Sequence, residues 1–371
     1  MKRRRYFAPA FFLLLCCVLC FVSLTQRKTE SFSFSFPSSR ISSLLQREKK
    51  AALQELTFIR KSYYLDETAL APRPDPQGYT VLYSAEEVLE LFDRASFLLN
   101  GRKPLFAADT PFDAEKGVRC YYDESILVLV WYQKVVEANR PVYHQATMAE
   151  IFLSDGSQFR RALSGDGFGS QQMKYPTDMA IDVNAVFASS GDFYRFRTPG
   201  FCVYRGELCK LNSDIIDTCA VDENGDLLFI PAGSLKTEEE ARAYISEHKV
   251  RFTLSFGPIL VENYESVRPD FYYSFGESYD RYPRMILSQW GKLHYVEMAT
   301  KDQLTAFEAG DILRSLGAER CYALDGGQTA TFVMEGTALN PGIYGQGNGA
   351  QRTQSDIIYF ASAIPESERG N

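Results

Sequence analysis

The chain has 371 residues, a formal net charge of −7, and a composition that is 45% hydrophobic and 14% aromatic. These values describe a globular protein with a large core, and the negative charge disfavours nucleic-acid binding. Only three histidines occur, which disfavours a histidine-based triad or a histidine-rich metal centre. Five cysteines lie beyond residue 26, an odd number with no Cys-x-x-Cys among them, so neither a disulfide framework nor a zinc site is indicated. We expect no metal and no cofactor.

The N-terminus carries a basic cluster at residues 2–5, followed by an uncharged stretch from Tyr6 to Leu24. At ~1.5 Å per residue such a helix nearly spans a hydrocarbon core of ~30 Å, and the basic cluster favours a cytoplasmic start. We therefore predict that residues 1–26 form a basic tip and a transmembrane signal anchor. A cleaved signal peptide is the alternative, but residues 23–26 offer no small-x-small cleavage site. The expected location is the cell membrane, with a single pass and the globular domain outside.

Residues 27–78 are predicted to form a linker and a helical stalk. A Ser/Phe repeat at residues 31–39 precedes a helical apolar stripe over residues 41–64. This helix either packs against its own domain or self-associates weakly as a short coil. The Pro-rich residues 71–78 indicate a linker, so the extracytoplasmic domain is expected to cover residues 79–371.

The domain alternates between helical and strand patterns. A capping box at Ser84 predicts a helix to Leu99, and apolar runs predict strands at 126–132 and 148–153. The acidic residues 222–226 lie between two apolar runs and predict a hairpin turn rather than a calcium loop. Further helices are expected from residue 237 to about residue 248 and over residues 304–316. The predicted fold class is α+β, with mixed β-sheets and flanking helices.

A strand at residues 321–324 ends in Asp325-Gly326-Gly327, followed by hydroxyl residues. A carboxylate at the end of a strand, next to glycines that admit close backbone approach, is typical of a ligand site. An ordinary Asp-Gly turn between two strands is the alternative.

Several blocks occur in an order that resembles the phosphodiester glycosidase family, and the resemblance extends over about residues 142–361. They are Ala185–Arg197, Ser255–Val261, Tyr282-Pro283-Arg284, the Asp-Gly-Gly block at 325–327, Asn340-Pro341, Arg352, and Ser355–Phe360. The family includes N-acetylglucosamine-1-phosphodiester α-N-acetylglucosaminidase and bacterial proteins related to exopolysaccharide. The resemblance implies a hydrolase that cleaves between the anomeric carbon of a sugar and a phosphodiester.

That chemistry requires a cation to bind the departing phosphate and a carboxylate near the oxocarbenium-like carbon. The resemblance implies the catalytic carboxylates Asp325, Glu297 and Asp192. It also implies that the substrate, a phosphosugar or envelope glycan, is bound by arginines, by backbone at glycines, and by hydroxyl groups. These residues are Arg284, Arg352, Ser190, Gly191, Gly326, Gly327, Thr329 and Thr331. We expect Arg284 and Arg352 to converge on one anion.

The sequence also departs from the family's motifs. The family's asparagines are replaced by Ser190 and Ala323, and its Asp-Gly-Arg corresponds to Glu297-Met298-Ala299. Because such groups can each contribute about 2–4 kcal/mol to a transition state, their loss predicts a weaker enzyme. Two functions remain open: a membrane-anchored hydrolase of an envelope glycan or exopolysaccharide, and a catalytically weakened glycan-binding or envelope-assembly protein.

Overall fold

The computed structural model describes residues 63–106, 110, 113, 115–138, 140–196, 198–269, 280–340 and 351–369. The predicted membrane span and almost all of the predicted stalk lie outside these residues. Within them, no helix combines the length and the apolar character that crossing a membrane would require.

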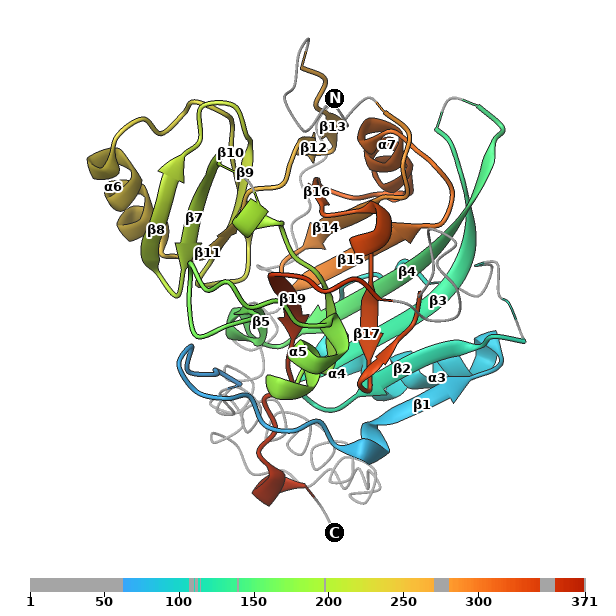
Figure 1. Ribbon diagram of the computed structural model, residues 1–371. Helices are drawn as coiled ribbons and strands as arrows, with labels where there is room; N and C mark the ends of the chain where they lie inside the picture. Colours follow the sequence, from blue (N-terminus) through green and yellow to red (C-terminus); the bar gives the residue numbers. More distant parts are fainter. Residues whose placement is uncertain are drawn as a thin grey trace, which may run out of the picture. The chain divides into compact units, whose positions relative to one another are not determined.

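Five α-helices and three β-sheets form the described part of the chain (Figure 1). The helices are α3 (Ala85–Arg94), α4 (Ser96–Leu99), α5 (Pro176–Asp182), α6 (Glu238–His248) and α7 (Ala306–Leu316). The strands are β1 (Tyr79–Leu82), β2 (Val118–Tyr122), β3 (Ile126–Val136), β4 (Tyr143–Leu153), β5 (Phe159–Leu163), β6 (Phe187–Ser190), β7 (Gly200–Tyr204), β8 (Glu207–Asn212), β9 (Thr218–Asp222), β10 (Leu227–Ile230), β11 (Val250–Leu254), β12 (Ile259–Glu262), β13 (Glu265–Ser266), β14 (Met285–Gly291), β15 (His294–Thr300), β16 (Arg320–Leu324), β17 (Phe332–Met334), β18 (Thr337–Ala338) and β19 (Asp356–Phe360).

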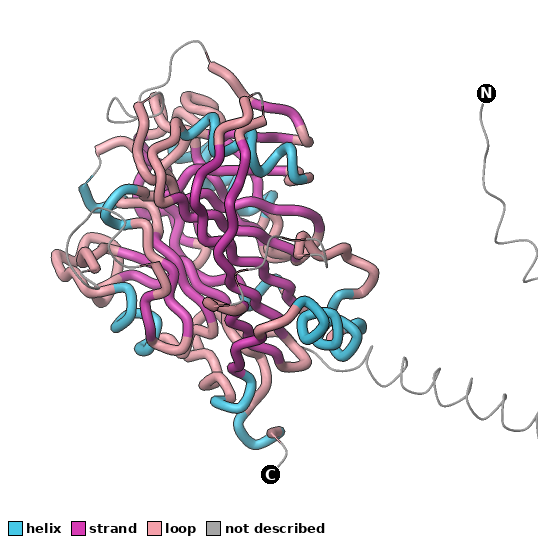
Figure 2. The backbone as a smooth tube through the Cα atoms, turned by 90° about the vertical axis from the view of Figure 1, so that its right-hand side faces the viewer, coloured by secondary structure: helices cyan, strands magenta, loops and turns pink. Residues whose placement is uncertain are grey.

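The largest sheet has nine strands in the order β1-β2-β3-β4-β15-β14-β16-β12-β13. Two five-stranded sheets have the orders β10-β9-β11-β7-β8 and β18-β17-β6-β19-β5. Every strand pairing among the described residues is antiparallel. Strands dominate the tube view, with helices at the periphery (Figure 2). The α+β class is confirmed, but the parallel pairings that the predicted mixed sheets would contain do not occur among the described residues.

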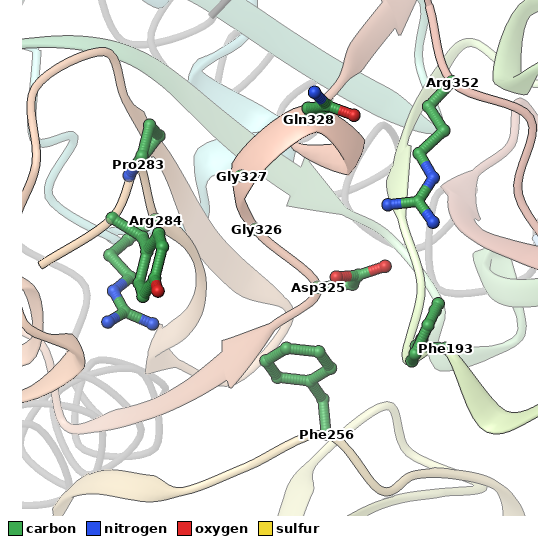
Figure 3. Close-up of a pocket in the computed structure, with 10 residues that line it drawn as sticks. Phe193, Phe256, Pro283, Arg284, Asp325, Gly326, Gly327, Gln328 and Arg352 are labelled. Atoms are coloured by element: carbon green, nitrogen blue, oxygen red, sulfur yellow. The ribbon is translucent and has the colours of Figure 1, made fainter. Parts of the chain in front are cut away.

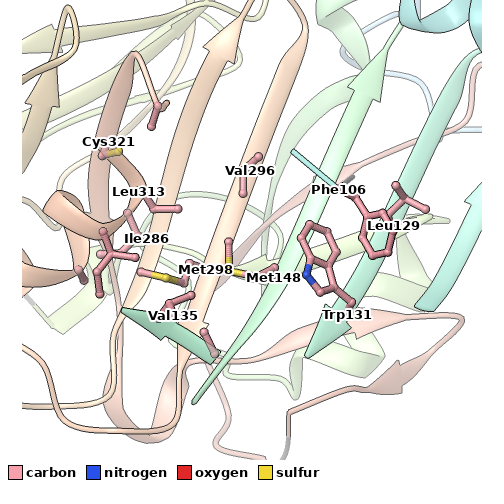
Figure 4. Close-up of a cluster of buried hydrophobic side chains, with 14 of the residues drawn as sticks. Phe106, Leu129, Trp131, Val135, Met148, Ile286, Val296, Met298, Leu313 and Cys321 are labelled. Atoms are coloured by element: carbon pink, nitrogen blue, oxygen red, sulfur yellow. The ribbon is translucent and has the colours of Figure 1, made fainter. Parts of the chain in front are cut away.

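Both faces of the nine-stranded sheet are buried. One face packs against α3, α4 and α7 through a cluster that includes Trp131, Met148 and Leu313 (Figure 4). The other face packs against the two five-stranded sheets through Phe187, Phe252 and other apolar side chains. This double burial explains the continuous apolar run of β3 from Ile126 to Tyr132.

Local signals define the helix ends. The Ser84 hydroxyl accepts from the Glu87 amide, and the Glu87 carboxylate accepts from the Ser84 amide, so the predicted capping box opens α3. Equivalent capping boxes open α6 at Thr237 and α7 at Thr305. The helix predicted to Leu99 is divided, because α3 ends at Arg94 and α4 follows.

The compact unit begins at Tyr63, earlier than the start expected near Tyr79. Arg160 donates to the backbone oxygens of Asp66 and Ala69, at 2.6 and 3.0 Å. Ala71 is also buried, so residues that the sequence assigned to a linker pack on the domain. The Pro-rich segment forms one short 3-10 turn at Pro76–Gly78 and no α-helix.

Candidate active site

The site forms where the strands of the nine-stranded sheet end on one side, which we call one edge of the sheet. At this edge β16 ends and β14 begins. Met285 pairs with Leu324, which brings Arg284 and Asp325 to the same edge although they are far apart in the chain. Helix α7 leads directly into β16, stops at Gly317, and packs on β16 and β12. The predicted sequence of helix, buried strand and glycine-rich turn is therefore confirmed.

A pocket of about 380 Å³ opens at this edge (Figure 3). It is lined by Phe193, Phe256, Tyr282, Pro283, Arg284, Asp325, Gly326, Gly327, Gln328 and Arg352. A narrow extension shares Phe193, Asp325 and Arg352 with it and continues to Ser355 and Asp356. The pocket thus combines a carboxylate, cations and aromatic rings contributed by segments that are distant in sequence.

The two arginines of the pocket differ in their availability. Arg284 is 7% exposed, and its guanidinium donates to the backbone oxygens of Leu304, at 2.8 Å, and Asp280. Arg352 is exposed and forms no ion pair within the described ranges. Figure 3 shows the two side chains on either side of the turn that begins at Asp325. Both arginines reach the same pocket, but only Arg352 offers an uncommitted guanidinium.

The two glycines after Asp325 line the pocket and also let the turn approach the chain closely. A Cβ at Gly326 would lie 2.7 Å from the Pro283 oxygen, so a side chain there would collide with backbone. Gly327 has a φ of +62° and donates its amide to the same Pro283 oxygen at 2.9 Å. The expected close approach exists, but its partner is the segment before β14.

The predicted hydroxyl contacts are buried and brace the turn from behind. Ser190 donates to the Thr329 oxygen at 2.6 Å and accepts from the Thr331 amide at 3.1 Å. The Thr329 hydroxyl donates to the Gly326 oxygen. Ser190, Thr329 and Thr331 are at most 3% exposed. They hold β6 and the turn together, and the structure gives none of them a place on the wall of the main pocket.

Asp192 does not line the pocket, because it belongs to a buried Asp–Arg–Asp cluster. Its carboxylate accepts from the Arg161 guanidinium at 2.7 Å and from the backbone amides of Tyr194 and Ser255, each at 2.8 Å. Arg161 also donates to Asp356 at 2.9–3.0 Å. Asp192 thus contacts Arg161 and two backbone amides and does not line the pocket, and its catalytic role stays a prediction.

The same cluster explains Gly191 and the charges of its members. A Cβ at Gly191 would lie 1.9 Å from the Asp356 carboxylate, so glycine is required where this carboxylate reaches the backbone. Burial alone would lower the pKa of Arg161, but Asp192 and Asp356 outweigh it and raise that pKa. Burial raises the pKa of Asp356, and the Arg161 cation opposes this rise.

Glu297, the third predicted carboxylate, lies in the interior of β15. It is 0% exposed, and neither of its side-chain oxygens has a hydrogen-bond partner in the described structure. Burial raises its pKa to about 8, and the nearby Ser189 hydroxyl offsets part of the rise although the two groups lack hydrogen-bond geometry. β15 ends at Thr300, so Glu297-Met298-Ala299 lies near the end of this strand, but the Glu297 carboxylate is buried and does not line the pocket.

Sequence reasoning missed Arg161, Phe193 and Phe256. The last two stand inside blocks that carried the resemblance, and Phe193 has a φ of +62°, which is rare for a bulky residue. Nothing local distinguishes Arg161, whose role depends on strand pairing with β19. Among the described residues, no group of His, Cys, Asp and Glu is arranged to hold a metal ion.

Comparisons with known proteins show what the segment that builds this site is similar to. Residues 183–361 match the model of the phosphodiester glycosidases. A search of curated proteins finds no match. The catalytic domain of zebrafish N-acetylglucosamine-1-phosphodiester α-N-acetylglucosaminidase, auto-inhibited by its pro-peptide, superposes with a TM-score of 0.53 at 12% identity, over 65% of this chain and 84% of that one. A hypothetical protein from Synechocystis gives a TM-score of 0.45 at 14% identity, over 69% and 65%.

The zebrafish domain shares the fold, while the family model matches the segment that contributes every labelled side chain of the pocket. Residues 183–361 of this chain are thus similar to the phosphodiester glycosidases, whose model they match.

Proposed function

We propose that this protein hydrolyses the bond between a sugar and a phosphodiester, with Asp325 and Arg352 as the principal catalytic residues. The observation that carries the proposal is the pocket in which this carboxylate and this uncommitted guanidinium lie beside three aromatic rings. The pocket lies in the segment that matches the model of the phosphodiester glycosidases.

The reaction has modest requirements, because phosphate is a good leaving group. The bond between the anomeric carbon and the phosphate oxygen breaks, and its electron pair leaves with the phosphate. Arg352 binds that phosphate as negative charge develops on it. Asp325 stabilises the oxocarbenium-like carbon, and water adds to the carbon and releases a proton. Phe193 and Phe256 provide apolar faces for the sugar ring.

Arg284 supports the site from within the fold. Its backbone amide donates to the Thr300 hydroxyl at 2.7 Å, and its guanidinium is held by backbone oxygens. It therefore positions the segment that receives Gly326 and Gly327, while its charge adds to the field that favours an anion.

The test is hydrolysis by the purified full chain of glycosyl phosphodiesters that share one small alkyl group and differ in the sugar. Release of free sugar is the expected result. Asp325→Asn keeps the size of the side chain and removes its charge, and should lower kcat by about 100-fold. Arg352→Gln should lower kcat/KM by a similar factor, about 100-fold.

Arg242→Gln is the matched control, since Arg242 is an exposed arginine on α6 with only a 3.6 Å ion pair to Glu238. It should leave the rate unchanged. Failure of the native chain to release sugar from any member of the panel would reject the hydrolase. Equal rates for the native chain and the Asp325→Asn variant would reject the assignment of Asp325.

We also propose that the protein works outside the cytoplasm, anchored by the uncharged stretch Tyr6–Leu24, on a glycan of the cell envelope or an exopolysaccharide. The basic residues before this stretch support that orientation. Protease added to intact cells should then degrade the domain, and full protection would contradict the proposal.

The second candidate is a glycan-binding protein that has lost catalysis. It is favoured by one observation, that Arg284 is already committed to backbone oxygens. Binding of a glycosyl phosphodiester without hydrolysis, unchanged in the Asp325→Asn variant, would support this function.

A further inference from the structure

The sheet edge that carries Asp325 continues across two further strand pairs. Leu324 at the end of β16 pairs with Met285, and Met285 pairs with Ala299 near the end of β15. Thr300 pairs with Ala146 near the start of β4. Because all of these pairings are antiparallel, the end of β16, the end of β15 and the start of β4 lie at one edge.

A second pocket, of about 340 Å³, opens farther along this edge. It is lined by Lys134, Tyr143, His144, Gln145 and Asp302. The hairpin of β3 and β4 extends beyond β15 here, since Tyr143–Gln145 pair only with Lys134–Val136. β4 and β16 are three strand positions apart, or about 14 Å at about 4.8 Å per strand. A ligand of a few sugar units is long enough to span this distance.

The floor of the second pocket is held by buried polar contacts. His144 is 6% exposed, and its Nε2 lies 2.9 Å from the Glu137 carboxylate. Glu137 in turn accepts from Arg140 at 2.6 Å. The Gln145 amide donates to the Asp302 carboxylate at 2.7 Å. The pocket is therefore preformed, with its carboxylates already in use.

The same network connects the second pocket to the first. Arg281 lies 3.7 Å from Glu137 and 2.8 Å from Glu308. The next residue, Tyr282, lines the pocket of Asp325. The segment of Arg281 and Tyr282 thus separates two pockets on one edge.

The groups that remain available at the second pocket are a cation and an aromatic ring. Tyr143 is 66% exposed, and an exposed aromatic face is suited to the apolar face of a sugar. Lys134 and the nearby Lys301 are exposed, and neither forms an ion pair within the described ranges of the chain. Asp302 keeps its negative charge although it accepts from the Gln145 amide, so the groups that can bind the anionic part of a ligand are the ammonium groups of Lys134 and Lys301.

We propose that this second pocket is a glycan subsite, which binds a further sugar phosphate unit of an anionic, polymeric substrate. The inference rests on the proposed function, because the reacting phosphodiester occupies the pocket of Asp325 and Arg352. Tyr143 packs against the sugar ring of the distant unit, and Lys134 binds its phosphate. The substrate class is therefore a glycan with repeating phosphodiester links.

The test compares two probes on the purified full chain: a single glycosyl phosphodiester with a methyl group, and an oligomer of about six repeats of the same unit. The double variant Lys134→Gln, Tyr143→Ala removes both proposed contacts at exposed positions. The control is Lys292→Gln, Tyr264→Ala, which changes the same residue types at the opposite edge of the sheet, where Lys292 is exposed and Tyr264 is 54% exposed.

The double variant should raise KM for the oligomer about tenfold, as expected when uniform binding is lost, and leave kcat and the single-unit kinetics unchanged. The control should alter neither probe. Equal effects on both probes, or none on the oligomer, would overturn the subsite. If the native chain hydrolyses neither probe, the proposed function fails. The subsite is then tested by calorimetric measurement of binding. It requires that the oligomer binds the native chain more tightly than the single unit does, and that the double variant loses this difference.

Discussion

Glu297 predicts a pH dependence of stability that can be isolated with one substitution. Its carboxyl is buried without a hydrogen-bond partner among the described residues, and burial raises its pKa from 4.5 to about 8. Between these two values the native state holds a proton that the unfolded chain has released. Stability must therefore fall as the pH rises through this interval.

The size of the effect follows from the two pKa values. Each pH unit between them lowers the free energy of unfolding by about 1.4 kcal/mol, because a difference of one pKa unit corresponds to that free energy. At pH 7 the loss relative to pH 4.5 is about 3 kcal/mol, and above pH 8 it levels off at about 5 kcal/mol. Such a loss is a large fraction of the stability of an ordinary domain.

The Glu297→Gln variant removes the titration and keeps the shape of the side chain. We expect the difference in free energy of unfolding between variant and native protein to shift toward the variant by about 5 kcal/mol between pH 4.5 and 8.5. Urea unfolding followed by tryptophan fluorescence measures it, since Trp131 is buried in the same sheet. The exposed Glu239→Gln change on α6 should produce no such shift. Parallel pH profiles for the native and Glu297→Gln proteins would refute the reasoning.

Three further substitutions test the support of the pocket. Arg161→Met leaves two buried carboxylates without their cation and should destabilise the protein by about 3–5 kcal/mol in urea unfolding. Ser190→Asn, which restores a family residue, should lower both stability and activity, because the hydroxyl at this buried position already bridges two backbone groups of the turn. Gly326→Ala places a methyl group against the Pro283 oxygen and should cost about 1–3 kcal/mol, whereas Gly167→Ala meets nothing within 4 Å and should be silent.

Local patterns in the sequence predicted the elements whose causes are local. The capping boxes at Ser84, Thr237 and Thr305 open helices, and Gly317 ends α7. The hairpin of β9 and β10 forms around the acidic turn at 222–226, where no calcium-binding role is needed. In each case a few neighbouring residues determine the backbone conformation, so a short stretch of sequence is enough to predict it.

The parts that escaped sequence reasoning depend on contacts between distant residues. Arg161 lies on β5, and its function follows from β19, where Asp356 is fixed by strand pairing. Periodicity identifies a strand but does not reveal which strands become neighbours. The same holds for Glu297, whose burial follows from packing between sheets.

The departures from the family's motifs acquire a different meaning in this fold. Ser190 is committed to the backbone of the turn, and Ala323 is 2% exposed among the apolar side chains beneath α7. Glu297 lies inside a strand. None of these three side chains lines the pocket of Asp325 and Arg352. Ala299, which stands where the resemblance places the family's Arg, pairs with Met285 beside the site, so the weaker enzyme stays a prediction. Because Arg284 is tied to backbone oxygens, the proposed reaction relies on Arg352 to hold the departing phosphate.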